Sequence, residues 1–290
     1  MHFTFARRLL IVLVVIVVLA VSVAAVLSLF RSYVLMATTT STRDTGLLDW
    51  LLPQFTADRG IEVRYTAVGT GQALEAGRRG DVDVVMVHAP SLEAQFMADG
   101  QGLCRNPIMY NTFVIVGSAS DLAGIANATS ATDAFLRIYD NRTRPGLAFE
   151  SRADNSGTYT KELQLWAGTG INASAFTATS DPWYERTGQG MGSTLTIANQ
   201  RDAYTLSDDG TWYAREGTLP FLRLLYSRAD AVLRNQYSVI PVNPAAHPSV
   251  LVDKAVAFAR WLVGERGQSL IANYTVNGHR IFTTDGAGAC

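Results

Sequence analysis

The apolar and polar positions of this chain change period repeatedly, from the alternation of strands to the spacing of helices. Short apolar runs predict strands, which we place at 33–37, 61–68, 82–87, 112–117, 147–149, 203–206, 222–226 and 237–242. Between them we expect helices at 45–55, 72–79, 91–99, 132–141, 158–166, 191–200, 208–215 and 252–263. Because strands and helices alternate, the pattern predicts an α/β fold with a mainly parallel sheet and helices on both faces.

The first segment of the chain is apolar without interruption. From Leu9 to Phe30 there are 22 residues and no charge, and about 20 apolar residues span a bilayer as a helix. Arg7 and Arg8 precede this run, which places the N-terminus in the cytoplasm and the remainder outside. A secretory signal cleaved near Val23–Ala25 is the alternative. In both cases residues 1–31 export the domain that follows, as a membrane anchor or as a signal sequence.

The net charge and the absence of enzyme motifs narrow the function. A formal net charge of −1 argues against a general nucleic-acid-binding protein, which would carry a basic surplus. The sequence contains no G-x-S-x-G, H-E-x-x-H or C-x-x-C motif, and its four histidines are scattered. We therefore expect a binding protein rather than an enzyme, with no metal site and no cofactor.

Two further features leave alternatives open. The two cysteines, Cys104 and Cys290, form one disulfide or remain two thiols, and an exported domain permits either outcome. Four N-x-[ST] sequons are expected to be surface glycosylation sites in a host with that machinery, and they begin at Asn127, Asn141, Asn172 and Asn273.

Four loops rich in Gly, Ser and Thr open predicted helices, at 38–45, 69–73, 152–158 and 187–194. Each presents hydroxyls and backbone N–H groups at a helix N-terminus, which attracts anions. The third loop brings an arginine, Arg152, which is suited to a planar, bidentate contact with an oxyanion. Any one loop would be ordinary helix capping, but together they lie where open α/β sheets bind ligands. The pattern predicts an anion site at this edge of the sheet.

Several long stretches carry a resemblance to a known family. They are TTTST at 38–42, DTGLLD at 44–49, VGTGQALE at 68–75, RRGDVDVVMVHAP at 78–90, MYNTFVIVG at 109–117, SRADNSGT at 151–158, WYERTGQGMGSTL at 183–195, AYTLSDDGT at 203–211 and YSVIPVNP at 237–244. From Tyr33 to Phe282 the chain resembles the tungstate-binding component of bacterial and archaeal ABC importers. Its R-x-D-x-S-G-T pattern is also similar, more distantly, to the phosphate-binding clamp proteins.

The resemblance implies a two-lobed type II periplasmic-binding-protein clamp, preceded by the N-terminal signal or transmembrane helix. Lobe one would comprise 32–111 and 237–290, and lobe two 112–236. The lobes would close by hinge motion around a tetrahedral oxyanion, tungstate or molybdate. The implied partners are an ABC permease and ATPase, and the implied protein is an exported monomer.

The resemblance also implies which residues contact the ligand, namely Thr39, Thr40, Ser41, Thr70, Arg152, Ser156, Gly157 and Thr158. His88 stands where the phosphate clamp has an aspartate, and it would donate to an anion that carries no proton, or simply pack at the strand end. Asp154 would orient the guanidinium of Arg152 or cap the helix, and Gln189 would lie behind the ligand contacts.

Three alternatives to a tungstate or molybdate importer subunit remain at this point. A short tether to the membrane would suit an anion sensor or surface module that serves no transporter. The same loops would also suit phosphate or sulfate. An enzyme acting on phosphate esters is the third alternative, and it lacks an evident pair of nucleophile and base.

Overall fold

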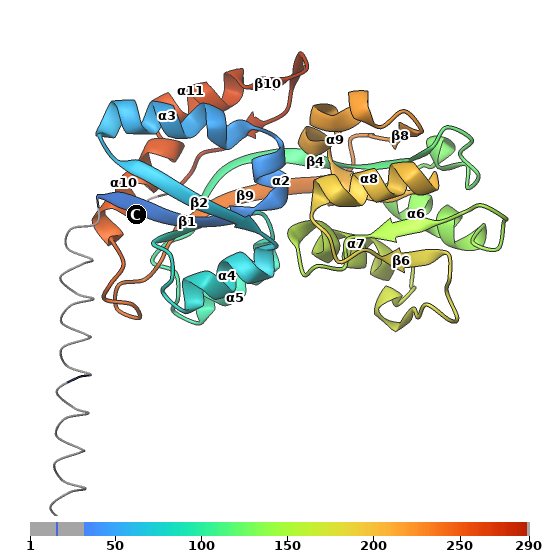
Figure 1. The fold of residues 1–290 in the computed structure, drawn as a ribbon, viewed down its shortest axis with the longest axis horizontal. Helices are drawn as coiled ribbons and strands as arrows, with labels where there is room; N and C mark the ends of the chain where they lie inside the picture. Colours follow the sequence, from blue (N-terminus) through green and yellow to red (C-terminus); the bar gives the residue numbers. More distant parts are fainter. Residues whose placement is uncertain (1–15, 17–31, 289–290) are drawn as a thin grey trace, which may run out of the picture.

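The computed structural model describes residue 16 and residues 32–288, and these form an α/β structure (Figure 1). Its strands are β1 (Tyr33–Thr39), β2 (Glu62–Val68), β3 (Val84–Val87), β4 (Asn106–Ser118), β5 (Phe149–Ser151), β6 (Tyr184–Arg186), β7 (Thr205–Asp208), β8 (Leu222–Tyr226), β9 (Arg234–Pro241), β10 (Thr275–Val276), β11 (His279–Arg280) and β12 (Thr283–Thr284). Its helices are α2 (Thr40–Asp44), α3 (Leu47–Arg59), α4 (Thr70–Arg78), α5 (Pro90–Ala98), α6 (Ala131–Asp140), α7 (Gly157–Gly168), α8 (Met191–Arg201), α9 (Asp209–Arg215), α10 (Val252–Val263) and α11 (Glu265–Asn273).

The main sheet is mixed, so the prediction of a mainly parallel sheet was wrong. Its path runs β12-β4-β9-β3-β1-β2, and β7 and β8 also pair with β4. Strand β1 is parallel to β2 and β3, but β9 is antiparallel to both β3 and β4, and β4 is antiparallel to β7 and β8. The alternation of strands and helices suggested repeated parallel units, but the long strands β4 and β9 pair with each other in opposite directions.

The buried apolar residues separate into groups on either side of the β4–β9 crossing. One pair of clusters contains β1–β3, most of β9 and helices α3–α5, α10 and α11. We call this part, together with the short helix α2 that follows β1, the first lobe. Another pair contains β5–β8 and helices α6–α9, and we call it the second lobe. Figure 1 shows these two groups side by side, with β4 and β9 running between them. The residue boundaries predicted for the two lobes stay a prediction.

The polar segment after β1 has more regular structure than the sequence suggested. We predicted a loop at 38–42, but β1 continues to Thr39 and helix α2 begins at Thr40. The prediction was wrong because Thr39 is itself the N-cap, and its hydroxyl accepts a hydrogen bond from the backbone N–H of Thr42 at 3.2 Å. Gly46, with φ of 77°, then separates α2 from α3. Strand β6 likewise lies inside a segment predicted as loop, 183–190.

Helix α7 begins directly at the third predicted loop, as the sequence indicated. Ser156 is its N-cap and accepts from the backbone N–H of Tyr159 at 3.1 Å. The preceding residues Ala153 and Asn155 have φ of 45° and 56°, a left-handed conformation uncommon outside glycine. These two residues turn the chain between β5 and α7, directly after Arg152.

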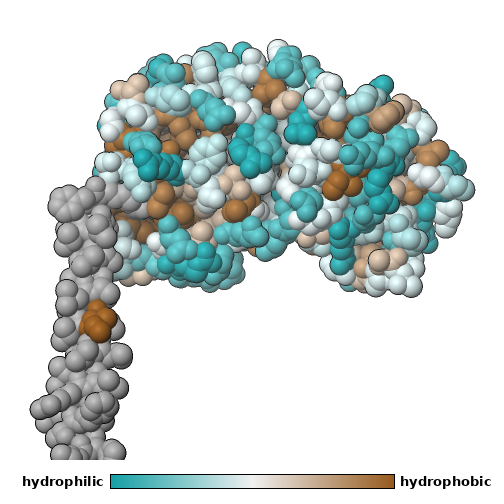
Figure 2. All heavy atoms as spheres, viewed as in Figure 1, coloured by the Kyte–Doolittle hydropathy of each residue, from teal (hydrophilic) through white to brown (hydrophobic). Residues whose placement is uncertain are grey.

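The surface and the ends of the chain bear on several predictions. Figure 2 shows a face on which hydrophobic residues are scattered among hydrophilic ones. Among the described residues, no helix has the length and apolar character needed to cross a membrane. The predicted leader at 1–31 lies outside the described residues except for residue 16.

Cys104 is disulfide-bonded, and Cys290 lies outside the described residues. The glycosylation of the four sequons stays a prediction.

Candidate functional site

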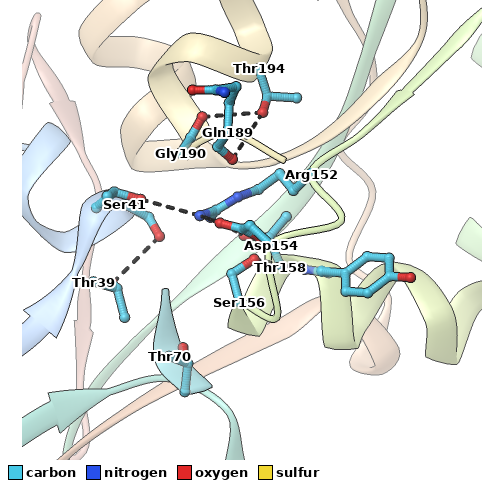
Figure 3. Close-up of polar contacts among 12 residues, drawn as sticks. Thr39, Ser41, Thr70, Arg152, Asp154, Ser156, Thr158, Gln189, Gly190 and Thr194 are labelled. Carbon is cyan, nitrogen blue, oxygen red and sulfur yellow. Dashed lines mark hydrogen bonds and ion pairs between the residues drawn. The ribbon is translucent and has the colours of Figure 1, made fainter. Parts of the chain in front are cut away.

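The predicted loops meet where the two lobes face each other (Figure 3). Nη2 of Arg152, from the second lobe, donates to Oγ1 of Thr40 in the first lobe at 3.2 Å. The backbone N–H of Gly157 donates to Oγ1 of Thr70 at 3.1 Å. Gly157 is the first residue of α7, and Arg152 lies in the loop before this helix. Both contacts therefore join the start of α7 to a hydroxyl of the first lobe. The chain therefore brings together loops that are more than eighty residues apart in sequence.

Two further contacts between the lobes run through the backbone. The N–H of Gly71 donates to the carbonyl of Asn155 at 3.1 Å. The N–H of Gly192, in the first turn of α8, donates to Oδ2 of Asp44 at 3.3 Å. All four loops predicted from the sequence thus take part in the contact between the lobes, and the cleft between them is closed.

Arg152 is the buried cation of this site. Its side chain is 1% exposed, and it forms an ion pair with Oδ2 of Asp154. Its Nη1 donates to Oγ1 of Thr158 at 3.2 Å. Among the described residues, Nε of Arg152 and Oδ1 of Asp154 have no hydrogen-bond partner. A buried guanidinium with an unused N–H is costly unless a further acceptor completes it, and an oxyanion would do so.

The predicted role of Asp154 agrees with its position. Its carboxylate pairs with Arg152 and therefore holds the guanidinium in one orientation. The helix cap is a different residue, Ser156, so the alternative role of Asp154 as a cap for α7 has no support. Whether the two side chains act on a ligand in this way stays a prediction.

The hydroxyls of the first lobe are buried beside this ion pair. Thr39, Ser41 and Thr70 are each fully buried. Oγ1 of Thr39 lies 2.7 Å from Oγ1 of Thr42 and 3.5 Å from Oγ of Ser41. The arginine of this loop, Arg43, is exposed and pairs with Asp44. The first lobe therefore contributes uncharged groups to the site.

His88 lies behind Ser41, between the loop and the crossing strands. Its Nε2 is 3.1 Å from Oγ of Ser41, and its Nδ1 is 2.8 Å from Oδ1 of Asn235. Its ring stacks on Tyr237 with centroids 4.8 Å apart. The pKa of His88 is lowered to about 4, mainly by burial and also by the charge of Arg152, although the hydrogen bond to Asn235 and the charge of Asp154 oppose this shift. The imidazole is therefore neutral near pH 7, and it reaches the site through Ser41.

Glycines allow the closest approaches between the lobes. A Cβ on Gly69 would lie 2.8 Å from the carbonyl oxygen of Asp154, and one on Gly157 would lie 2.7 Å from the carbonyl oxygen of His88. Side chains at these positions would collide with backbone across the cleft. The sequence indicated the loops, but it did not indicate that their glycines allow the backbones of the two lobes to approach each other closely.

Gln189 and Thr194 belong to the fourth loop. The hydroxyl of Thr194 donates to the carbonyls of Gln189 and Gly190, and the side chain of Gln189 is exposed. The predicted position of Gln189 behind the ligand contacts stays a prediction. Sequence reasoning missed Asn111 and Asn235 as residues of the site. They lie on the crossing strands, and Asn235 stands between Arg234 and Gln236, so the sequence pattern does not single it out.

The local electrostatics favour an anion over a cation. Helices α4, α7 and α8 all begin at the loops of the site, and each N-terminus carries a partial positive charge. Within residues 32–288, no group of three or more His, Cys, Asp or Glu side chains is arranged to hold a metal ion. One buried guanidinium, several hydroxyls and three helix N-termini together suit a small oxyanion.

Comparison with known proteins agrees with this geometry. Residues 30–266 match the model of the PBP superfamily domain. The chain is 41% identical over 246 residues to the tungstate-binding protein TupA of Peptoclostridium acidaminophilum, covering 84% of this chain and 82% of that protein. The chain is a member of the TupA family. The resemblance inferred from the sequence motifs is therefore confirmed.

Two solved structures extend the likeness to the fold. A tungstate-binding TupA from Desulfovibrio alaskensis G20 superposes with a TM-score of 0.72 at 42% identity, covering 89% of this chain and all of that chain. A structure from Geobacter sulfurreducens, described as a tungstate ABC transporter, gives 0.74 at 45% identity, covering 83% and 98%. The α/β periplasmic-binding-protein fold of this TupA family member is thereby confirmed.

Proposed function

We propose that this chain is an exported solute-binding protein that captures a tetrahedral oxyanion between its lobes, with tungstate the leading ligand and molybdate next. The carrying observation is Arg152, a guanidinium that is 1% exposed, retains an N–H without a partner among the described residues, and lies between the Asp154 carboxylate and the hydroxyls of Thr40 and Thr158. Tungstate and molybdate are dianions that carry no proton near neutral pH, so a site built from donors suits them. The names of the related proteins, which describe tungstate binding, support the same ligand.

The proposed mechanism is binding by closure rather than turnover. The lobes, proposed as 32–111 with 237–290 and 112–236, would rotate about β4 and β9 near Asn111 and Tyr237. An anion that binds the Arg152 loop would recruit the hydroxyls of Thr40, Ser41 and Thr70 as the cleft closes. Thr39, Ser156, Gly157, Thr158 and His88 complete the proposed contacts, directly or through a neighbour.

The proposed partners follow from the same function. A closed, loaded protein would dock on an ABC permease and its ATPase, as a name among the related structures suggests. The segment 1–31 would either tether the monomer to the outer face of the membrane or direct its secretion. No cofactor is needed, since tungsten or molybdenum would arrive as the oxyanion.

Calorimetric titration of the purified full chain with tungstate, molybdate, sulfate and phosphate tests the proposal. We expect one anion per chain, with tungstate and molybdate bound far more tightly than phosphate. Tighter binding of phosphate than of both metal oxyanions would replace the proposed ligand. Binding of none of the four would overturn the function itself.

A further inference from the structure

A row of buried polar side chains runs from the first lobe across the hinge strands to the second lobe. Oγ of Ser41 lies 3.1 Å from Nε2 of His88, and Nδ1 of His88 lies 2.8 Å from Oδ1 of Asn235. The amide of Asn235 donates to Oδ1 of Asn111 at 2.7 Å, and the amide of Asn111 donates to Oδ1 of Asp208 at 3.4 Å. None of the five side chains is more than 2% exposed. We call this set the polar row.

The direction of its hydrogen bonds is fixed from the Asp208 end. The Asp208 carboxylate accepts from the backbone N–H and the hydroxyl of Thr211 at 2.8 and 2.7 Å. Oδ1 of Asp208 accepts from the amide of Asn111 as well as from the Thr211 N–H, so Asn111 turns its NH₂ toward Asp208 and its oxygen toward Asn235, although burial raises the pKa of Asp208. Asn235 then turns its NH₂ toward Asn111 and its oxygen toward His88. Nδ1 of His88 must therefore carry a hydrogen.

This tautomer decides what Ser41 can do. A neutral imidazole with its hydrogen on Nδ1 has a bare Nε2, which only accepts. Ser41 then donates its one hydrogen to His88 and has only lone pairs left for a ligand. A second proton, on Nε2, reverses the bond, because the imidazolium donates to Oγ and frees the hydroxyl hydrogen for an anion.

We propose that His88 takes up one proton when a fully deprotonated dianion binds, and that Asn235 is the positioning residue that makes this proton control the Ser41 hydroxyl. The inference rests on the proposed function, since it requires an anion in contact with Ser41. Neutral His88 suits an anion that brings its own hydrogen, such as hydrogen phosphate. Protonated His88 suits sulfate, molybdate or tungstate. The protonation state of His88 therefore helps to decide which anion the site prefers.

The charges around His88 make this uptake depend on the ligand. Burial and the neighbouring Arg152 keep the pKa of His88 low, at about 4, while Asn235 and Asp154 oppose them. Lys161 and Arg234 line the same cavity of about 410 Å³ as His88, and Arg234 forms an ion pair with Asp285. A dianion beside Ser41 acts in the opposite direction and raises the pKa. Because the bound value exceeds the free value, affinity rises as pH falls between the two.

Calorimetry of the full chain with molybdate and with sulfate, in buffers of different ionisation enthalpy, counts the protons. Both anions stay fully deprotonated from about pH 6 to 8, so any uptake belongs to the protein. We expect uptake approaching one proton per anion at about pH 6, and an affinity that rises by up to about tenfold per pH unit of acidification. Binding without proton uptake, at an affinity independent of pH, would overturn the inference and leave the proposed function intact. Failure of every anion to bind would overturn the proposed function.

Two variants separate the polar row from a merely structural role. His88→Gln places a permanent amide donor beside Ser41, so we expect anion binding to persist without proton uptake. Asn235→Leu removes the acceptor that fixes the tautomer, so the uptake should fall even where the affinity at one pH changes little. Gln236→Leu is the matched control, because Gln236 bonds to the Met109 carbonyl and Asp285 outside the polar row. Unchanged proton uptake in His88→Gln would show that His88 is not the group that takes up the proton.

Discussion

The two sides of the cleft meet the proposed anion with different chemistry. The first lobe presents hydroxyls and backbone, and its loop arginine, Arg43, is exposed and paired with Asp44. The second lobe presents the buried Arg152, held by Asp154 on a loop with two left-handed residues. Charge compensation is thus concentrated in one lobe, while the other supplies neutral donors. The difference implies an order, in which the anion first binds the charged loop and then recruits the hydroxyls as the cleft closes.

Removal of the buried positive charge of the second lobe should weaken anion binding more than any other change. We expect Arg152→Ala to weaken tungstate binding by about 2–5 kcal/mol, because truncation leaves the anion and Asp154 without their buried partner. The exposed Arg43 provides the control, and Arg43→Ala should bind nearly as wild type. Titration calorimetry measures both variants, and a loss below about tenfold in Arg152→Ala would contradict the assignment.

A charge of the wrong sign in the first lobe should have the next largest effect. His88→Asp places a carboxylate behind Ser41, and at a separation of about 7 Å and an effective dielectric of about 20 it repels each of the two negative charges of a dianion by about 2 kcal/mol. The new carboxylate also fixes Ser41 as its donor, so hydrogen phosphate, which brings a proton, should lose less affinity than tungstate. Competition titrations at two pH values give the ratio of the two affinities. An unchanged ratio would mean that His88 only packs at the strand end.

A small obstacle to closure should weaken binding without any change of charge. The Cβ of Gly69→Ala would meet the Asp154 carbonyl at 2.8 Å, and overpacking of this kind costs about 1–3 kcal/mol. We expect weaker anion affinity and little change in the melting temperature of the ligand-free protein. Gly217→Ala is the control, because no atom lies within 4 Å of its Cβ. Equal affinities in the two variants would show that binding does not require this contact between the lobes.

Single hydroxyls should contribute less than the charge. Ser156→Ala and Thr158→Ala should each weaken tungstate binding by about 1–3 kcal/mol, because each removes a hydrogen-bond partner of a charged group. Both variants should also lose some stability, because Ser156 caps α7 and Thr158 accepts from Nη1 of the buried Arg152. Parallel titration and thermal unfolding separate the two effects. Wild-type affinity in both variants would mean that the hydroxyls of the loop 152–158 do not contact the anion.

The smallest expected effect concerns the packing behind the charged loop. Burial raises the pKa of Glu162 to about 7, against hydrogen bonds from Tyr184, Ser151 and Trp166 that lower it. A carboxyl whose pKa is raised on folding stabilises the protein at low pH, and this stabilisation is lost as pH rises from its unfolded value through about 7. Glu162→Gln should therefore flatten the decline in unfolding free energy over this range. Denaturant unfolding of the ligand-free protein at several pH values measures the slope, and an unchanged slope would contradict the assignment.

The sequence predicted the loops better than the sheet. Gly, Ser and Thr at helix starts, with Arg152 and Asp154 two residues apart, indicated the parts of the site because capping and anion binding depend on local chemistry. The antiparallel pairing of β4 with β9 depends on residues more than a hundred positions apart, and periodicity carries no information on it. The polar row was missed for the same reason, since Asn111 and Asn235 are 124 residues apart and meet only in the register of that pair.

The central claim is that an oxyanion lies between the buried guanidinium of one lobe and the hydroxyls of the other. A crystal structure of the full chain grown with tungstate locates the metal directly by its anomalous scattering. The account predicts one peak inside the closed cleft, with anion oxygens within hydrogen-bond distance of Nε of Arg152 and of the hydroxyls of Ser41 and Thr70. A tungsten peak outside this cleft, or tungstate in the cleft without contact to Arg152, would contradict it.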